Sequence, residues 1–102
     1  RLDRVEAPWH AHEEAIESYE MLLEIDPNVV SAWYNKGVAL RKLGRYEDAI
    51  ECFNRALKIN PDYAKAWKNK GVALDKLGQD DEAVKCYNKA REIDPNIAIV
   101  VK

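Results

Sequence analysis

The 102-residue sequence lacks the features that mark membrane, secreted and nucleic-acid-binding proteins. It contains no run of roughly 18 or more apolar residues, so no membrane-spanning helix and no membrane partner are expected. No signal peptide is visible either. The net charge of −2 argues against nucleic acid as the main partner, because neutralising phosphates requires a dense basic surface. These absences describe a small soluble globular chain.

Cysteine is also scarce, and the two cysteines do not have the spacing of a disulfide pair. Cys52 and Cys86 are 34 residues apart and occupy the same place in successive similar segments. Equivalent atoms of stacked helical pairs lie about 8–10 Å apart, whereas a disulfide needs Cα atoms within about 7 Å of each other. We therefore expect two reduced thiols and a cytoplasmic location, since cytosolic thiols are kept reduced.

The sequence offers no recognisable catalytic constellation. It has two histidines, no glycine-rich phosphate loop, and no serine or cysteine beside a base in a nucleophile arrangement. His10, His12, Glu13 and Glu14 could chelate a divalent ion only from an extended segment, because residues two apart do not share a helix face. We expect solvated side chains there, hence no metal site, no cofactor and no enzymatic activity.

What the sequence does contain is an internal repeat. Pro27, Pro61 and Pro95 stand 34 residues apart, and each follows a similar short segment. Aligning residues 30–63 with residues 64–97 makes half of the 34 positions identical. A fixed period in the range of roughly 20–50 residues is typical of units that stack on one another to bury a shared core.

Each unit has the pattern of two helices. Trp33, Gly37 and Leu40 recur at three- and four-residue steps and predict one helix, which Gly44 ends by adopting the left-handed conformation. A second helix is expected over residues 47–59. It should end there because the next residue precedes Pro61 and is therefore disfavoured in the α region.

The next unit repeats the pattern, with Asp80 as the expected N-cap of its second helix. The recurrent glycines predict close approach of the two helices of a pair, because glycine inside a helix costs roughly 1 kcal/mol against alanine. The recurring signature positions are Trp33, Gly37, Ala49, Phe53 and Pro61 in one unit, and Trp67, Gly71, Ala83, Tyr87 and Pro95 in the next.

This order of residues at a 34-residue period resembles the tetratricopeptide repeat. The resemblance covers residues 30–97 fully, and residues 13–29 as the second helix of a preceding unit. Lys36 and Lys70 depart from the family pattern, which has leucine there. A lysine stem can still cover apolar surface while its ammonium stays in water.

The resemblance implies an all-α fold, a right-handed superhelix of helical hairpins. Residues 1–102 then form a single array of a partial or degenerate repeat (1–29), two whole repeats (30–63 and 64–97), and the start of a truncated further repeat (98–102). Pro8 is incompatible with a helix interior, at a cost of ~3 kcal/mol. Either residues 1–12 are a degenerate first helix, or a short helix with Pro8 in its first turn leads into the next one. Trp9 is expected to pack on the hairpin.

In tetratricopeptide arrays the first helices line a concave groove, which here implies a net positive surface. The implied positions carry five cations and one carboxylate, a net charge of +4, so the rest of the chain carries −6. Asn35 and Asn69 are the best-placed donors to an extended peptide backbone. The expected groove residues are Tyr34, Asn35, Val38, Arg41, Lys42, Lys65, Lys68, Asn69, Val72 and Lys76, with Ser31 and Asp75 at the remaining positions.

The sequence thus predicts a non-enzymatic scaffold that binds an extended, acidic peptide or C-terminus of a protein partner in its concave groove. The alternative is a structural role: apolar ends without a polar cap would make the chain dimerise or polymerise as a homo-oligomer. A two-carboxylate clamp of the kind that binds chaperone tails is matched at only Asn35 and Lys65.

Overall fold

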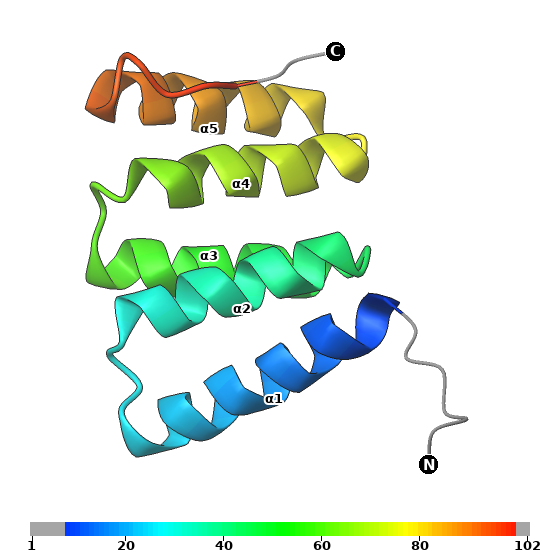
Figure 1. The fold of residues 1–102 in the computed structure, drawn as a ribbon. Helices are drawn as coiled ribbons and strands as arrows, with labels where there is room; N and C mark the ends of the chain where they lie inside the picture. The colour runs from blue at the N-terminus through cyan, green and yellow to red at the C-terminus, as the bar shows by residue number, and fades with distance from the viewer. Residues whose placement is uncertain (1–7, 100–102) are drawn as a thin grey trace.

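The computed structural model describes residues 8–99, and all the regular secondary structure within them is helical. Five helices follow one another through short turns and stack into an elongated array (Figure 1). Their bounds are α1 (Pro8–Ile25), α2 (Val30–Lys42), α3 (Tyr46–Ile59), α4 (Ala64–Lys76) and α5 (Asp80–Ile93).

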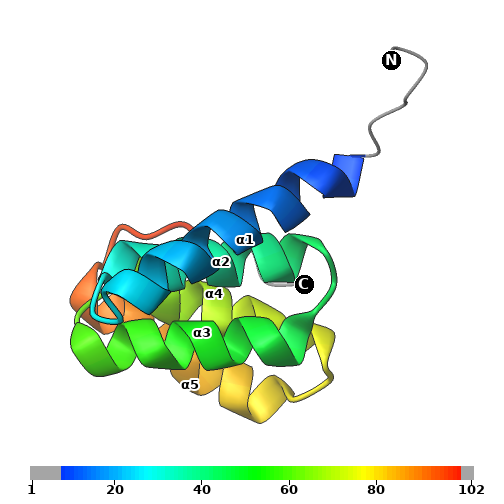
Figure 2. The same ribbon diagram turned by 90° about the horizontal axis from the view of Figure 1, so that it is seen from below.

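The helices pair into antiparallel hairpins, α2 with α3 and α4 with α5, and these two pairs make the most extensive contacts. The hairpins stack through α3 against α4, and α1 packs on α2. The backbones of the first helices α2 and α4 also approach each other, whereas those of α3 and α5 lie farther apart. Figure 2 accordingly shows α2 and α4 toward one side of the array and α3 and α5 toward the other. The expected all-α superhelix of helical hairpins is confirmed.

Close helix approach within each hairpin depends on a glycine facing an aromatic ring. A Cβ atom at Gly37 would lie 2.6 Å from Cε1 of Phe53, and one at Gly71 would lie 2.6 Å from Cε1 of Tyr87. Real carbon atoms do not approach so closely, so any larger residue would push α2 away from α3 or α4 away from α5. The packing role expected of these glycines is confirmed.

The first helix of each hairpin ends at a glycine in the left-handed conformation. Gly44 has φ 81°, and the backbone N–H groups of Gly44 and Arg45 donate to the carbonyls of Arg41 and Leu40, 2.9 Å each. This is the Schellman motif, which satisfies carbonyls that the helix end leaves open. Gly78 repeats it with φ 80°. The C-terminal role expected of Gly44 is thus confirmed.

The expected N-cap of α5 is wrong. Asp80 is the first residue of the helix, and Gln79 holds the cap position without a side-chain hydrogen bond. The reason is the tightness of the turn: Gln79 directly follows Gly78, and its N–H already donates to Leu74 in the preceding helix end. Asp80 instead joins Asp81 in an acidic first turn, where negative charge complements the helix dipole.

At the N-terminal end, α1 begins at Pro8 and continues without a break to Ile25. Proline fits there because the first N–H groups of a helix have no intrahelical partner. The expected place of Pro8 in a first helical turn is therefore confirmed, but the helix is α1 itself and not a short helix that leads into another one. The expected packing of Trp9 concerns a side chain outside the described part, as do the expectations for residues 1–7.

The core consists of two clusters, one per hairpin. Phe53 is fully buried in the first, and Tyr87 is 3% exposed in the second. Trp67 packs against both clusters and so joins the hairpins. After α5, residues 97–99 are not helical, and Ile99 packs against the second cluster. This segment lies on the same side as α2 and α4 (Figures 1 and 2).

Candidate functional site: the concave face

Two cavities lie along the face that α2 and α4 present. The α2–α4 cavity has a volume of about 520 Å³, and the α4–α5 cavity has a volume of about 750 Å³. The residues that line both cavities, and therefore mark where they meet, are Arg41, Lys68, Asn69 and Ala98. The two cavities together form a continuous groove.

The residues expected to form the groove are largely brought together there. Asn35 is exposed on α2 but lines neither cavity. The residues that do line one cavity or both are Tyr34, Val38, Arg41, Lys42, Lys65, Lys68, Asn69, Val72 and Lys76. Sequence reasoning missed the contributions of α5 and of the segment after it, namely Asp80, Val84, Tyr87, Asp94, Ile97 and Ala98.

The side chain of Asn69 is committed to holding the groove together. It is 7% exposed, and its Nδ2 donates to the hydroxyl oxygen of Tyr34 and to the carbonyl oxygen of Lys65, both at 3.0 Å. An asparagine amide has only two hydrogens to donate. Asn69 therefore has no N–H left for a bound peptide, and it links α2 to α4 instead.

Tyr34 is fixed in place on two sides. Its ring stacks on Tyr63, with 4.7 Å between centroids, and lies tilted against Phe53 at 6.0 Å. Burial raises the pKa of the Tyr34 hydroxyl, as does Tyr63, while Arg41 and the hydrogen bond from Asn69 oppose the shift. The hydroxyl is therefore protonated at neutral pH and able to donate a hydrogen bond.

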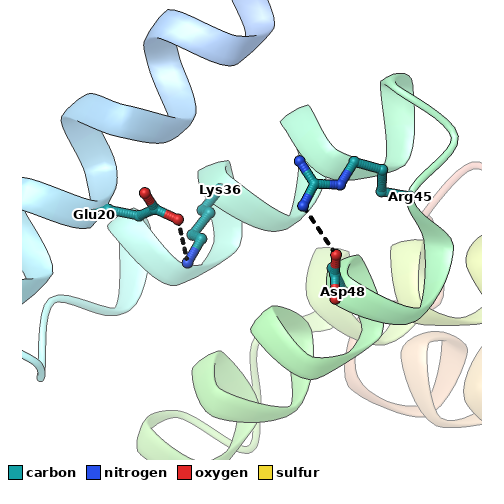
Figure 3. Close-up of polar contacts among 4 residues, drawn as sticks. All are labelled: Glu20, Lys36, Arg45 and Asp48. Atoms are coloured by element: carbon teal, nitrogen blue, oxygen red, sulfur yellow. Dashed lines mark hydrogen bonds and ion pairs between the residues drawn. The ribbon is translucent and has the colours of Figure 1, made fainter.

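The groove contains five cations, Arg41, Lys42, Lys65, Lys68 and Lys76. Within residues 8–99 none of them forms an ion pair. Outside the groove, four cations of the described part form ion pairs with carboxylates, and Arg55, Lys58, Lys70 and Arg91 do not. Lys36 lies 3.2 Å from Glu20, and Arg45 lies 3.2 Å from Asp48 (Figure 3). In addition, Nε of Arg41 is buried without a hydrogen-bond acceptor. The two cavity linings thus carry five cations against three carboxylates, Asp75, Asp80 and Asp94, so the groove is net positive but less so than the expected +4.

The α5 end of the groove has a different character. Tyr87 donates a 2.8 Å hydrogen bond from its hydroxyl to Oδ2 of Asp75. Burial, together with the adjacent carboxylate, raises the pKa of Tyr87 well above its usual range. The equivalent residues of the preceding repeat are Phe53 and Arg41, so the two repeats carry opposite charge at this position. The positive character is therefore concentrated between α2 and α4.

A smaller cavity of about 310 Å³ lies near the polar contacts of Figure 3, and Cys52 lines it together with Lys36 and Glu20. Cys52 and Cys86 are both free and buried, as the sequence predicted. Burial raises the pKa of the Cys52 thiol to about 11, although Lys36 opposes the shift. A thiol with this pKa is protonated at neutral pH, so Cys52 is not an activated nucleophile.

The part of the chain that the structure describes contains no group of three or more residues placed to hold a metal ion. Within residues 8–99 no helix is both long enough and apolar enough to cross a membrane.

Comparison with known structures gives several similar folds. A crystal structure of MamA superposes with a TM-score of 0.80 at 27% identity, covering 83% of this chain and 50% of that one. A second, designated MamA MSR-1 C2, has a TM-score of 0.80 at 28% identity, covering 86% and 51%. This chain therefore spans about half the length of the MamA chains. No curated protein matches it.

Family models match most of the sequence. The model described as tetratricopeptide repeat matches residues 30–63 and 64–97, and a second model, described as TPR repeat, matches residues 11–44. The matched repeats and the stacked hairpins support a protein-interaction scaffold. The chain belongs to the tetratricopeptide repeat family.

Proposed function

We propose that this array is a non-enzymatic scaffold whose concave groove binds an extended, acidic peptide segment of a partner protein. The observation that carries the proposal is the set of five cations without ion pairs along two joined cavities. Unpaired cations on a concave surface raise the local concentration of anions and speed their association. An acidic segment would provide the charge that the groove lacks.

The shape of the groove favours an extended ligand. Val38 and Val72 lie on α2 and α4 at equivalent positions of the two repeats, one lining each cavity. A continuous surface with apolar side chains between cations suits a strand that alternates acidic and apolar residues. Asn35 is exposed beside this surface and remains the best-placed amide donor to the backbone of such a strand.

The proposal can be tested with a fluorescein-labelled, eight-residue probe peptide that has three glutamates and an amidated C-terminus, and with a control probe in which all three are glutamine. Fluorescence anisotropy should show preferential binding of the glutamate probe. That preference should weaken between about 50 and 500 mM salt, because exposed charges are screened. Equal binding of both probes at low salt would refute the proposal.

A matched pair of variants separates the groove from general charge. Lys42→Ala with Lys65→Ala removes two exposed cations that line the α2–α4 cavity. Lys58→Ala with Arg91→Ala removes two exposed cations from α3 and α5 that line neither cavity. The groove variant should bind the glutamate probe about tenfold more weakly, and the control should bind like the unmodified chain. Equal losses would locate binding outside the groove.

A second candidate is self-association, and it is supported by an apolar surface on α1. Met21 is 66% exposed, Leu22 42% and Ile25 83%, all near the end of the helix. Exposed apolar surface of this kind is typical of contact sites. Light scattering over a range of concentrations tests the idea: Ile25→Lys should abolish any dimer, and a strictly monomeric chain at high concentration would refute it.

A further inference from the structure

We propose that the Tyr34 hydroxyl, the Arg41 guanidinium and the Lys68 ammonium form a single carboxylate-binding subsite, which Asn69 holds in place. The inference rests on the proposed function and assigns its anchor point. All four residues line the α2–α4 cavity. Tyr34 and Arg41 are seven residues apart on α2, about two helical turns, and so lie on one face. Lys68 comes from the facing helix α4.

The direction of the hydrogen bond between Asn69 and Tyr34 leaves a donor unused. Because Nδ2 of Asn69 is the donor, the Tyr34 oxygen accepts, and the hydroxyl hydrogen must point elsewhere. No acceptor for that hydrogen occurs among the described residues. Stacking on Tyr63 fixes the position of the Tyr34 oxygen, and the O–H bond can rotate toward an acceptor in the cavity. The Tyr34 oxygen is thus held at the cavity with a hydrogen available to donate.

Arg41 presents a charge that the described protein leaves uncompensated. Its Nε is enclosed without an acceptor, and its side chain as a whole is only partly exposed. A partly desolvated guanidinium without a partner is unfavourable, and a carboxylate is the group that matches its planar donors. Arg41 also lines both cavities, so an anion bound to it would sit where the cavities meet.

The carboxylates of the protein that lie nearby are engaged elsewhere. Asp94 lines the α2–α4 cavity, but its Oδ1 accepts the backbone N–H of Asn96 at 3.1 Å. Asp75 accepts the hydroxyl of Tyr87. Neither forms an ion pair with Arg41 or Lys68 within residues 8–99. Within the described residues the three donors of the subsite therefore have no carboxylate partner, and a ligand carboxylate would take the place of solvent there.

Asn69 acts in this subsite as a positioning residue. Its Nδ2 orients the Tyr34 hydroxyl, and its second hydrogen bond, to the Lys65 carbonyl, fixes its own orientation on α4. Asn69→Asp would reverse the polarity of the contact, because a carboxylate accepts the Tyr34 hydrogen and adds a negative charge to the cavity. A ligand carboxylate would then lose a donor and meet a like charge.

The decisive experiment compares the glutamate and glutamine probes on Tyr34→Phe. This change removes one hydroxyl and retains the ring contacts with Tyr63 and Phe53. Loss of a hydrogen bond to a charged group should lower the affinity for the glutamate probe about tenfold. The affinity for the glutamine probe should change little. A purely structural role would weaken both probes equally. Tyr63→Phe is the matched control and should leave both affinities unchanged.

Two additional arms complete the test. Arg41→Gln probes the same subsite without touching the aromatic contacts, and it should also reduce the preference for glutamate about tenfold. A glutamine probe with a free C-terminus shows the source of the carboxylate. If Tyr34→Phe weakens binding of this probe, the subsite takes the carboxylate of a chain end. If Tyr34→Phe weakens binding of the glutamate probe only, the subsite takes the carboxylate of a side chain. Either result supports the subsite.

Failure of the subsite can be distinguished from failure of the proposed function. If the unmodified chain binds the two amidated probes equally, both the acidic groove and the subsite are refuted. If it prefers the glutamate probe and this preference is intact in both Tyr34→Phe and Arg41→Gln, with far-UV circular dichroism unchanged, the groove remains and the subsite is refuted.

Discussion

The indole Nε1 of Trp33 donates a 2.8 Å hydrogen bond to the carbonyl oxygen of Pro27. Trp67 makes the same bond to Pro61, again at 2.8 Å. Each bond ties the first turn of a first helix to the loop that enters it. The bond gives the recurring tryptophan a role in the turn between repeats as well as in packing. Its acceptor is a backbone carbonyl that any residue could supply, so the proline recurs for its effect on the backbone.

Removing the indole N–H should therefore destabilise the array without disturbing its packing. Replacing Trp67 with 3-benzothienylalanine keeps the ring shape and substitutes sulfur for the N–H. We expect the free energy of unfolding to fall by about 1 kcal/mol, the typical net worth of such a bond. Urea denaturation followed by circular dichroism measures it. An unchanged midpoint would mean that water replaces the bond at no cost.

Gly37 should tolerate no side chain while Phe53 is present. A Cβ at Gly37 lies 2.6 Å from the Phe53 ring, so Gly37→Ala forces the helices apart and should cost about 1–3 kcal/mol. Thermal unfolding measures the loss. Gly37→Ala combined with Phe53→Leu should be more stable than the sum of the single changes predicts, because the shorter side chain relieves the clash. Strict additivity would argue against this contact.

The ion pair between Lys36 and Glu20 joins α2 to α1 (Figure 3). The Lys36 side chain is 18% exposed and that of Glu20 is 52% exposed, and Nζ of Lys36 also lies 5.6 Å from the Trp33 ring centroid. Glu20→Gln should lower the free energy of unfolding by up to about 1 kcal/mol, and less in high salt. Glu17→Gln, an exposed change on the same helix, is the control. Equal effects of the two changes would indicate that only net charge matters.

The raised pKa of Cys52 makes part of the stability dependent on pH. The folded state favours the neutral Cys52 thiol. The contribution of this thiol to the free energy of unfolding is therefore complete below the pKa of the unfolded thiol, and it is lost as pH rises toward about 11. The difference in unfolding free energy between the unmodified chain and Cys52→Ala should therefore narrow from pH 8.5 to pH 10.5. Taking the difference removes the titration of tyrosines and lysines common to both. A constant difference would show that the pKa of the thiol is the same in the folded and unfolded states.

Much of the fold follows from local chemistry and could be predicted. Gly44 was placed at a helix end because only glycine adopts a positive φ at little cost, and it has φ 81°. Gly37 is predicted to lie at a close contact between helices, because glycine is unfavourable inside a helix and yet recurs at the equivalent position, Gly71. Asp80 was placed wrongly as an N-cap because the preceding turn is one residue tighter than its sequence indicates.

The groove was predictable in position but not in detail. The family period placed Arg41 and Lys68 on one surface, and the two cavities meet there. The role of Asn69 could not be predicted, because its partner Tyr34 lies 35 residues away and their contact depends on how two hairpins stack. The contribution of Tyr87 to the cavity wall was missed for the same reason.

The sequence by itself determined the helices and their order, since proline and glycine act on the backbone within a few residues of where they stand. It also determined which side chains share a helix face, because helical periodicity is local. Only the tertiary structure decided which donors are already used and which remain free. Hydrogen bonds between repeats, such as that from Asn69 to Tyr34, form only when α4 packs against α2. Within the described residues, that packing leaves the Tyr34 hydroxyl hydrogen and the Arg41 Nε–H without an acceptor.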